Sequence, residues 1–360
     1  MTKARWFGLI VLIIVSTGIL MVYSSSHIWA AYKFNDAFYY LKRQLLFGVL
    51  GLMMMLVFAR LDYHWYFRYR KLILMIGFLL LGLVLMPGVG SVRGGSRSWF
   101  GLGPLSFQPS ELFKVAIIIY MAHYLGKHYT ATRKLKTMLL PLLLMMGGFL
   151  LIMCQPDFGT GCVMALSVIM MIMVTAFPFK YFLWLAGIGV LGVGILILSA
   201  PYRLARITAY LDPFSDPLGS GFQMIQSLYA IGPGGLVGVG FDQSFQKHFY
   251  LPEPQTDFIF AIFCEEFGFL GGVILIGLFG LLLYLGVRIA LTAPDSEGSF
   301  LGIGIIGMIA IQIMINLGVV VGLLPVTGIT LPFMSYGGSS LVILMSASGI
   351  IMNIARRSQA

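Results

Sequence analysis

The chain has 360 residues, of which 59% are hydrophobic and only 10% are charged. A soluble domain carries about 25% charged residues, so this composition excludes an ordinary water-soluble enzyme and indicates an integral membrane protein. The net charge of +10 does not require a nucleic-acid partner, because lysines and arginines in cytoplasmic loops produce the same excess in a membrane protein.

Apolar runs recur along the whole chain, and each is near the length that a helix needs to cross a hydrocarbon core about 30 Å thick. Ten such runs lie at about 6–26, 44–59, 72–87, 110–125, 138–154, 159–177, 181–199, 258–288, 300–323 and 335–354. They predict an all-α polytopic membrane protein with ten transmembrane helices. No linker divides the chain, so residues 1–360 are expected to form one membrane domain.

The basic residues predict the orientation. Ten spans place both termini on one side, and with the termini inside, 14 of the 23 lysines and arginines fall in inner segments and 8 in outer ones. Because cytoplasmic loops are enriched in these residues, both termini are predicted to be cytoplasmic. The connection between the seventh and eighth helices, about 200–257, is then a large extracytoplasmic loop. A loop of this length is usually functional.

Signatures of nucleotide and metal binding are weak. Two G-x-G-x-x-G matches, which begin at Gly187 and Gly302, lie inside predicted transmembrane helices, where glycines let helices approach closely. The five histidines are scattered singly, and the three cysteines lie in or beside apolar runs. Neither a protein-held metal site nor a disulfide framework is therefore predicted.

The fourth apolar run opens with QPSELFK, in which Glu111 and Lys114 face the same side of a helix. An unpaired charge inside a span costs about 2.5–3.5 kcal/mol, so an embedded pair needs a reason. Two interpretations stay open. The pair is either a structural contact between helices or part of a cavity for a charged lipid headgroup, with Lys114 facing a pyrophosphate.

The eighth run contains two adjacent acids, Glu265 and Glu266, which point to different sides of a helix. Both cannot face lipid cheaply, so at least one should face other helices or water. Each is interpreted as structural rather than catalytic, and the sequence does not assign either acid a role.

The stretch YLPEPQTDFIF, residues 250–260, places a carboxylate directly before the eighth run. Two prolines restrict the backbone, and residues before proline, such as Glu253, favour an extended conformation. Thr256 can cap the following helix, which would place Asp257 in its first turn. Asp257 is then either a capping carboxylate without chemistry or a general base at the outer membrane surface.

Several motifs together resemble the SEDS family of bacterial membrane proteins, which comprises FtsW, RodA and SpoVE. The motifs are QPSELFK, QPDFGTG, DPLGSGFQMIQSLYAIGPGG, YLPEPQTDFIFA and PVTGITLPFMSYGGSS. MVYSSS and LSAPYRLARITAYLDPFSDPLGSGFQ are most similar to the FtsW and SpoVE side. The resemblance runs from the first span to the last, and it implies ten helices with a large outer loop between the seventh and eighth.

The resemblance implies peptidoglycan glycosyltransfer, in which lipid II is polymerised into β-1,4-linked glycan strands at the outer face of the bacterial cytoplasmic membrane. It implies a role in division, shape or sporulation, and a class B penicillin-binding protein transpeptidase as partner. The family's essential aspartate falls on Asp257, and its fourth-helix acid and lysine fall on Glu111 and Lys114.

The tryptophan before the fourth helix is Trp99, but here Ser98 separates it from Arg97, whereas many relatives have an arginine directly before the tryptophan. In the implied inverting reaction, undecaprenyl diphosphate leaves as an anion. Its charge would be met by Lys114, by Arg97 or Arg203, and by a divalent cation such as Mg or Mn. Two other functions stay open: a lipid II flippase that uses the embedded charges as a polar track, and a non-catalytic scaffold for a cell-wall synthase.

Overall fold

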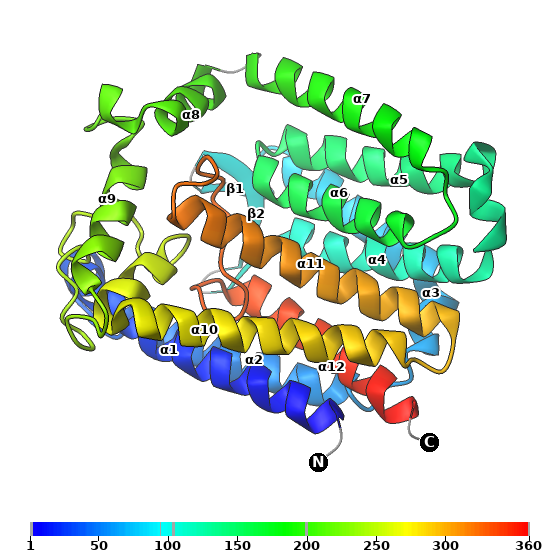
Figure 1. Ribbon diagram of the computed structural model, residues 1–360, viewed down its shortest axis with the longest axis horizontal. Helices are drawn as coiled ribbons and strands as arrows, with labels where there is room; N and C mark the ends of the chain where they lie inside the picture. The colour runs from blue at the N-terminus through cyan, green and yellow to red at the C-terminus, as the bar shows by residue number, and fades with distance from the viewer. Residues whose placement is uncertain (1–2, 94, 103–104, 199–200, 359–360) are drawn as a thin grey trace.

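The computed structural model describes residues 3–93, 95–102, 105–198 and 201–358. Long helices lie side by side, and both chain ends are at the same end of the bundle (Figure 1). Each of the ten apolar runs coincides with a helix, namely α1 (Lys3–Phe34), α2 (Tyr39–Phe58), α3 (His64–Leu85), α4 (Pro109–Lys127), α5 (Leu135–Cys154), α6 (Phe158–Met173), α7 (Phe179–Leu198), α10 (Ile259–Leu291), α11 (Ser296–Val320) and α12 (Gly338–Arg357).

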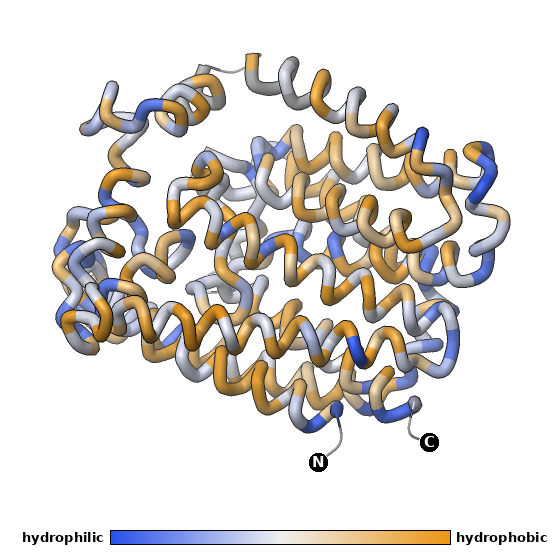
Figure 2. The backbone as a smooth tube through the Cα atoms, viewed as in Figure 1, coloured by the Kyte–Doolittle hydropathy of each residue, from blue (hydrophilic) through white to orange (hydrophobic). Residues whose placement is uncertain are grey.

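Six of these helices, α1, α2, α5, α10, α11 and α12, are long and apolar enough to cross a membrane. Helix α6 and the first part of α7 are shorter apolar helices. Hydrophobic residues run along the helices, and hydrophilic residues gather toward their ends (Figure 2). The predicted all-α membrane protein is therefore confirmed, while the count of ten spans and the side on which each end lies stay predictions.

A three-stranded antiparallel sheet between α3 and α4 was not predicted from the sequence. Its strands, in the order β1-β2-β3, are β1 (Gly90–Arg93), β2 (Ser96–Leu102) and β3 (Leu105–Phe107). Trp99 pairs with Ser91 and Arg97 pairs with Val92, which leaves Ser98 as the extra residue of a β-bulge. The bulge thus falls at the residue that separates Arg97 from Trp99.

The connections between helices gather at two ends of the bundle (Figure 1). The tail end holds both termini and the connections 59–63, 128–134, 174–178 and 292–295. The loop end holds 35–38, 86–108, 155–157, 321–337 and the long loop between α7 and α10. Short helices punctuate these connections: η1 (Thr130–Arg133), α8 (Pro201–Leu211), η2 (Pro213–Ser215), α9 (Phe222–Ile231) and η3 (Gly232–Gly234).

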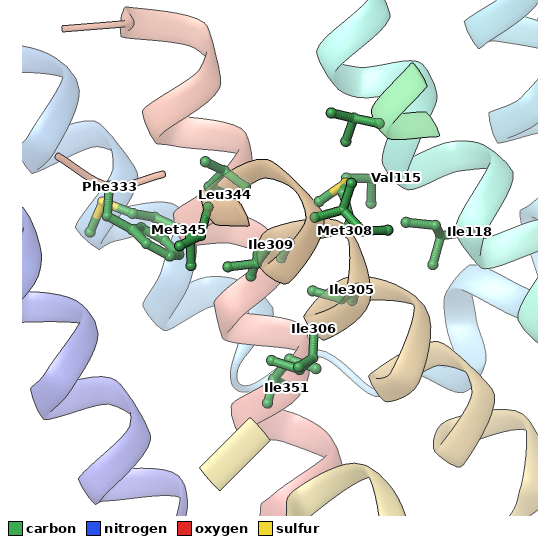
Figure 3. Close-up of a cluster of buried hydrophobic side chains, with 14 of the residues drawn as sticks. Val115, Ile118, Ile305, Ile306, Met308, Ile309, Phe333, Leu344, Met345 and Ile351 are labelled. Carbon is green, nitrogen blue, oxygen red and sulfur yellow. The ribbon is translucent and has the colours of Figure 1, made fainter. Parts of the chain in front are cut away.

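The middle of the bundle is packed by aliphatic side chains of α4, α11 and α12. Ile118, Ile305, Ile309 and Leu344 meet there and are almost fully buried (Figure 3). Helix α11 lies at the centre of this packing, since it contacts α4, α6, α10 and α12. Helix α11 is therefore the central helix of the bundle.

The two G-x-G-x-x-G matches differ in their packing. In α11, a Cβ atom added at Gly302, Gly304 or Gly307 would lie within 2.7 Å of a side chain from a neighbouring helix. The close-packing interpretation is confirmed for this match. In α7, a Cβ at Gly187 or Gly189 would meet nothing within 4 Å, so close packing does not explain those glycines in this arrangement.

Candidate functional site

Asp257 lies at the loop end, two residues before α10 begins at Ile259. The N-cap position is occupied by Phe258 without a side-chain bond, and the Thr256 hydroxyl donates backward to the main-chain oxygen of Glu253 at 2.8 Å. The predicted capping role of Thr256 is therefore wrong. Asp257 precedes the first turn of the helix, and its side chain is half-buried.

The backbone that leads to Asp257 is strained rather than extended. Glu253 has φ = 46°, in the left-handed region, although it precedes Pro254. The proline disfavours the right-handed helical region, and the Thr256 amide closes a turn onto the Glu253 oxygen at 3.1 Å. Such residues cost about 1–3 kcal/mol each and persist only where the surrounding structure holds them.

The connection between α11 and α12 borders the Asp257 carboxylate. Asn316 donates from Nδ2 to the main-chain oxygens of Asp257 and Ile329, each at 2.7 Å. Gly328 has φ = 75°, and a Cβ built on it would lie 3.8 Å from Oδ2 of Asp257. The neighbour of the carboxylate on this side is thus a residue without a side chain.

Glu111 and Lys114 form the predicted pair, and both are almost fully buried. Nζ of Lys114 lies 2.8 Å from Oε1 of Glu111, and Ser340 donates to Oε2 at 3.1 Å. Apart from this ionic contact, the ammonium group has no hydrogen-bond acceptor within the described chain. A buried donor of this kind is suited to an anionic group.

A second polar contact beside this pair was not predicted from the sequence. Gln108 donates from Nε2 to Asp157 at 2.8 Å and from its amide to Ser339 at 3.3 Å. Asp157 also caps α6 through the amide of Thr160. Burial raises the pKa of Asp157, and the bonds from Thr160 oppose that shift. The sequence did carry a signal for this contact, because polar residues stand at the start of an apolar run in each of the motifs QPSELFK, QPDFGTG and SYGGSS.

The segment 327–340 joins the two parts of the site. At one end Gly328 lies beside Asp257, and at the other Ser340 binds Glu111. The chain therefore brings the carboxylate before α10 and the buried pair of α4 against one continuous segment.

Glu265 and Glu266 are both 1% exposed and face the protein, as expected for at least one of them. Glu265 accepts a bond from the Ser244 hydroxyl at 2.5 Å. Glu266 accepts from the Ser24 hydroxyl of α1 at 2.5 Å and lies 3.5 Å from Nζ of Lys247. These partners belong to α1 and the long loop, so the two acids connect those segments to α10.

A protein-family model described as a cell cycle protein, FtsW/RodA/SpoVE, matches residues 4–360. This chain belongs to that family. It is 54% identical over 352 residues to stage V sporulation protein E of Bacillus subtilis (strain 168), covering 98% of this chain and 96% of that protein. It is 40% identical over 362 residues to the probable peptidoglycan glycosyltransferase FtsW of Geobacter sp. (strain M18), covering 99% of each.

Solved structures support the same family membership. One chain comes from a structure described as the structural coordination of polymerization and crosslinking by a peptidoglycan synthase complex. It matches with a TM-score of 0.79 and 33% identity over 98% of both chains. RodA of Thermus thermophilus matches with a TM-score of 0.73 and 30% identity, covering 98% of this chain and 97% of RodA. The resemblance to the SEDS family is confirmed, and this family member is a multi-pass membrane protein.

The remaining candidates lie at the loop end of the family fold. Arg97 and Trp99 are half-buried on β2, on either side of the bulge. Ser96 donates to Ser98 at 2.9 Å and to the main-chain oxygen of Gln155, which ties the bulge to the α5–α6 connection. Arg203 belongs to α8, and its side chain lies outside the described residues.

Proposed function

We propose that this family member is a peptidoglycan glycosyltransferase that polymerises lipid II into β-1,4-linked glycan strands. One observation carries the proposal. The half-buried carboxylate of Asp257 lies beside Gly328, and Gly328 belongs to the segment 327–340, which also contacts the buried Glu111–Lys114 pair. The names of the relatives support it, since one is a probable peptidoglycan glycosyltransferase and one neighbour is part of a peptidoglycan synthase complex.

In the proposed reaction, Asp257 accepts the proton of the acceptor's 4-hydroxyl group. The oxygen forms a bond to the anomeric carbon of the donor, and the bond from that carbon to the lipid diphosphate breaks. Attack opposite the leaving group inverts an α-linked donor to a β-linked product. Because the diphosphate leaves as an anion, no second carboxylate has to protonate it, unlike the acid and base pair of glycoside hydrolysis.

Lys114 is the proposed partner of the diphosphate, because its ammonium group is buried and, apart from the contact with Glu111, has no acceptor within the described chain. Glu111 would hold Lys114 in place through the contact at 2.8 Å. Arg97 and Arg203 remain candidates for the same charge, and Trp99 for the sugar. Preorganised cations of this kind stabilise charge that develops on a leaving group.

A divalent cation, Mg or Mn, is the remaining candidate for the diphosphate charge. Among the described residues, no group of three or more His, Cys, Asp or Glu side chains is placed to hold a metal ion. A cation that the diphosphate itself helps to bind would need no such group, because Mg²⁺ is usually held by one or two carboxylates together with substrate phosphates. The divalent cation therefore stays a proposal, and no step of the proposed reaction passes through one.

The proposal also implies an orientation of the protein in the membrane. The loop end, with Asp257, would face the outside, both termini would be cytoplasmic, and the ten apolar helices would span the bilayer. The polyprenyl tails of donor and acceptor would then stay in the outer leaflet while their sugars meet Asp257. A class B penicillin-binding protein would crosslink the product, as the peptidoglycan synthase complex among the structural neighbours suggests.

Polymerisation of purified lipid II tests the proposal. Asp257→Asn should insert normally and form no glycan, while Glu253→Gln, which removes an exposed carboxylate four residues earlier, should retain activity. The assay is run with and without a class B penicillin-binding protein, and lipid II movement across vesicles is followed in parallel. Undiminished polymerisation by Asp257→Asn would exclude this residue as the base. Flipping without glycan product would favour a transporter, and neither activity would favour a scaffold.

A further inference from the structure

The long loop is built into α10 at a break in that helix. Gly268 has φ = 67° and ψ = −167°, and the backbone of residues 235–240 fills the gap. Two loop amides donate to the main-chain oxygens of Glu265 and Glu266, each at 3.0 Å. The loop is therefore held by the same hydrogen-bonding groups that a continuous helix would have used for itself.

Lys247 follows this junction and is only 2% exposed. Its ammonium group donates to the carboxylate of Asp242 and, at 2.7 Å, to the main-chain oxygen of the same residue. It also lies 3.5 Å from Oε1 of Glu266 and 3.5 Å from the hydroxyl of Ser24. These four residues, Ser24, Asp242, Lys247 and Glu266, are called here the Lys247 cluster.

The Lys247 cluster joins three parts of the molecule through one buried cation. Ser24 comes from the MVYSSS motif of α1, Glu266 from α10, and the other two residues from the long loop. A buried lysine is stable only when charge and hydrogen bonds compensate it, so its place in the structure is tightly determined.

The segment between Lys247 and Asp257 has neither helix nor strand. Phe249 and Glu253 lie in the left-handed region, with φ values of 66° and 46°. At its far end the Tyr336 amide donates to the main-chain oxygen of Gln255 at 2.8 Å. Strained residues of this kind keep their conformation only when both ends of the segment are fixed.

We propose that Lys247 is a positioning residue for Asp257. The Lys247 cluster anchors the start of the segment 248–256, the bond from Tyr336 anchors its end, and the two anchors together set where the carboxylate stands. This inference rests on the proposed function of Asp257. Displacement of a catalytic group by about 1 Å can cost on the order of 100-fold in rate, so the anchor should affect turnover rather than substrate binding.

Kinetics of lipid II polymerisation by the full-length Lys247→Met protein test the role. The expected result is a kcat lowered by about 100-fold, with the KM for lipid II changed by less than about twofold. Hydrogen exchange of residues 248–257 should quicken by about tenfold or more, while α11 stays protected. Lys42→Met is the matched control, because it removes a lysine from an exposed pair with Asp36 at the loop end and should change neither quantity.

If Lys247→Met does not fold, Ser24→Ala is the second variant, since it removes a bond to Glu266 without leaving a buried charge unpaired. It should shift kcat and the exchange of 248–257 in the same direction by a smaller factor. A normal kcat in Lys247→Met beside an inactive Asp257→Asn would overturn this inference alone, and so would faster exchange spread evenly over the chain. Full activity of Asp257→Asn would instead overturn the proposed function.

Discussion

Two ion pairs, one at each end of the bundle, hold their charges in opposite ways. At the tail end, Arg357 and Asp62 form an ion pair at 2.8 Å while their side chains remain 44% and 40% exposed. At the loop end, Lys247 and Glu266 lie 3.5 Å apart with side chains 1% and 0% exposed. Exposed pairs contribute about 0–1 kcal/mol, whereas a buried charge that loses its partner costs about 3–5 kcal/mol.

The backbone shows the same division. Among the described residues other than glycine and proline, every residue with positive φ belongs to a loop-end connection: Asn35, Asp242, Phe249, Glu253 and Phe333. The tail-end connections within the described chain contain none. Buried charge and backbone strain therefore coincide at the end that carries Asp257, which is where a preorganised site is expected to store them. The tail end closes the bundle with short turns, and its Arg357–Asp62 pair is solvated.

The largest effect that would sharpen this comparison is expected at Lys114. Lys114→Glu would place a second carboxylate beside the buried Glu111, so we expect neither stable protein nor glycan product.

Lys114→Met combined with Glu111→Gln removes both charges and should fold. Its polymerisation rate should fall by about 10²–10³-fold if the ammonium group meets the leaving diphosphate. Lipid II polymerisation and yield from membranes measure both effects, and a normal rate in the neutral double variant would leave the pair with a structural role only.

A smaller effect is expected at the break of α10. A Cβ at Gly268 would lie 2.3 Å from the amide nitrogen of Gly238, and its φ of 67° is strained for any other residue. Gly268→Ala should therefore separate the long loop from α10 and lower the melting temperature in detergent by several degrees. Gly277→Ala in the same helix is the control, since nothing lies within 4 Å of its Cβ position. That change should be neutral or stabilise the helix by up to about 1 kcal/mol.

Equal melting temperatures for the two alanine variants would show that the junction tolerates a side chain. The loop end would then be no more tightly determined than the tail end, and the contrast between them would be lost.

The sequence predicted the parts of this molecule that depend on local pattern. All ten apolar runs form helices, because the length and hydrophobicity of a run are enough to predict a helix there. The sheet before α4 was missed, since its short strands have too few residues to show a pattern. The break at Gly268 could not be found either, because the groups that replace the helical bonds lie about thirty residues earlier in the chain.

In the candidate site, too, some contacts could be predicted from the sequence and others could not. The spacing of Glu111 and Lys114 was sufficient to predict their contact, because both belong to one helix. The capping role of Thr256 was wrong, because a turn onto Glu253 competes for its hydroxyl. The partners of Glu266 were not predictable, since one comes from α1 and another from the long loop. Contacts within one helix could be predicted from the sequence, and contacts between segments distant in the chain could not.

The smallest effect is expected at Asp62, in the tail end. Burial acts to raise its pKa, but hydrogen bonds from the main chain and ring of His64, together with the charge of Arg357, outweigh burial and hold the pKa below its ordinary value. A carboxylate whose folded-state pKa is lowered stabilises the fold above its ordinary pKa of about 3.9, and that stability is lost as the pH falls through the lowered value. Asp62→Asn should therefore cost at most about 1 kcal/mol at pH 7. The difference between the two proteins should begin to shrink as the pH falls below about 3.9 and should vanish below the lowered pKa. Melting curves at pH 7 and pH 3.5 measure the difference, and polymerisation at pH 7 should stay within about twofold of normal. A large loss of polymerisation by Asp62→Asn would contradict the comparison, because it would place functional charge at the end that only closes the bundle.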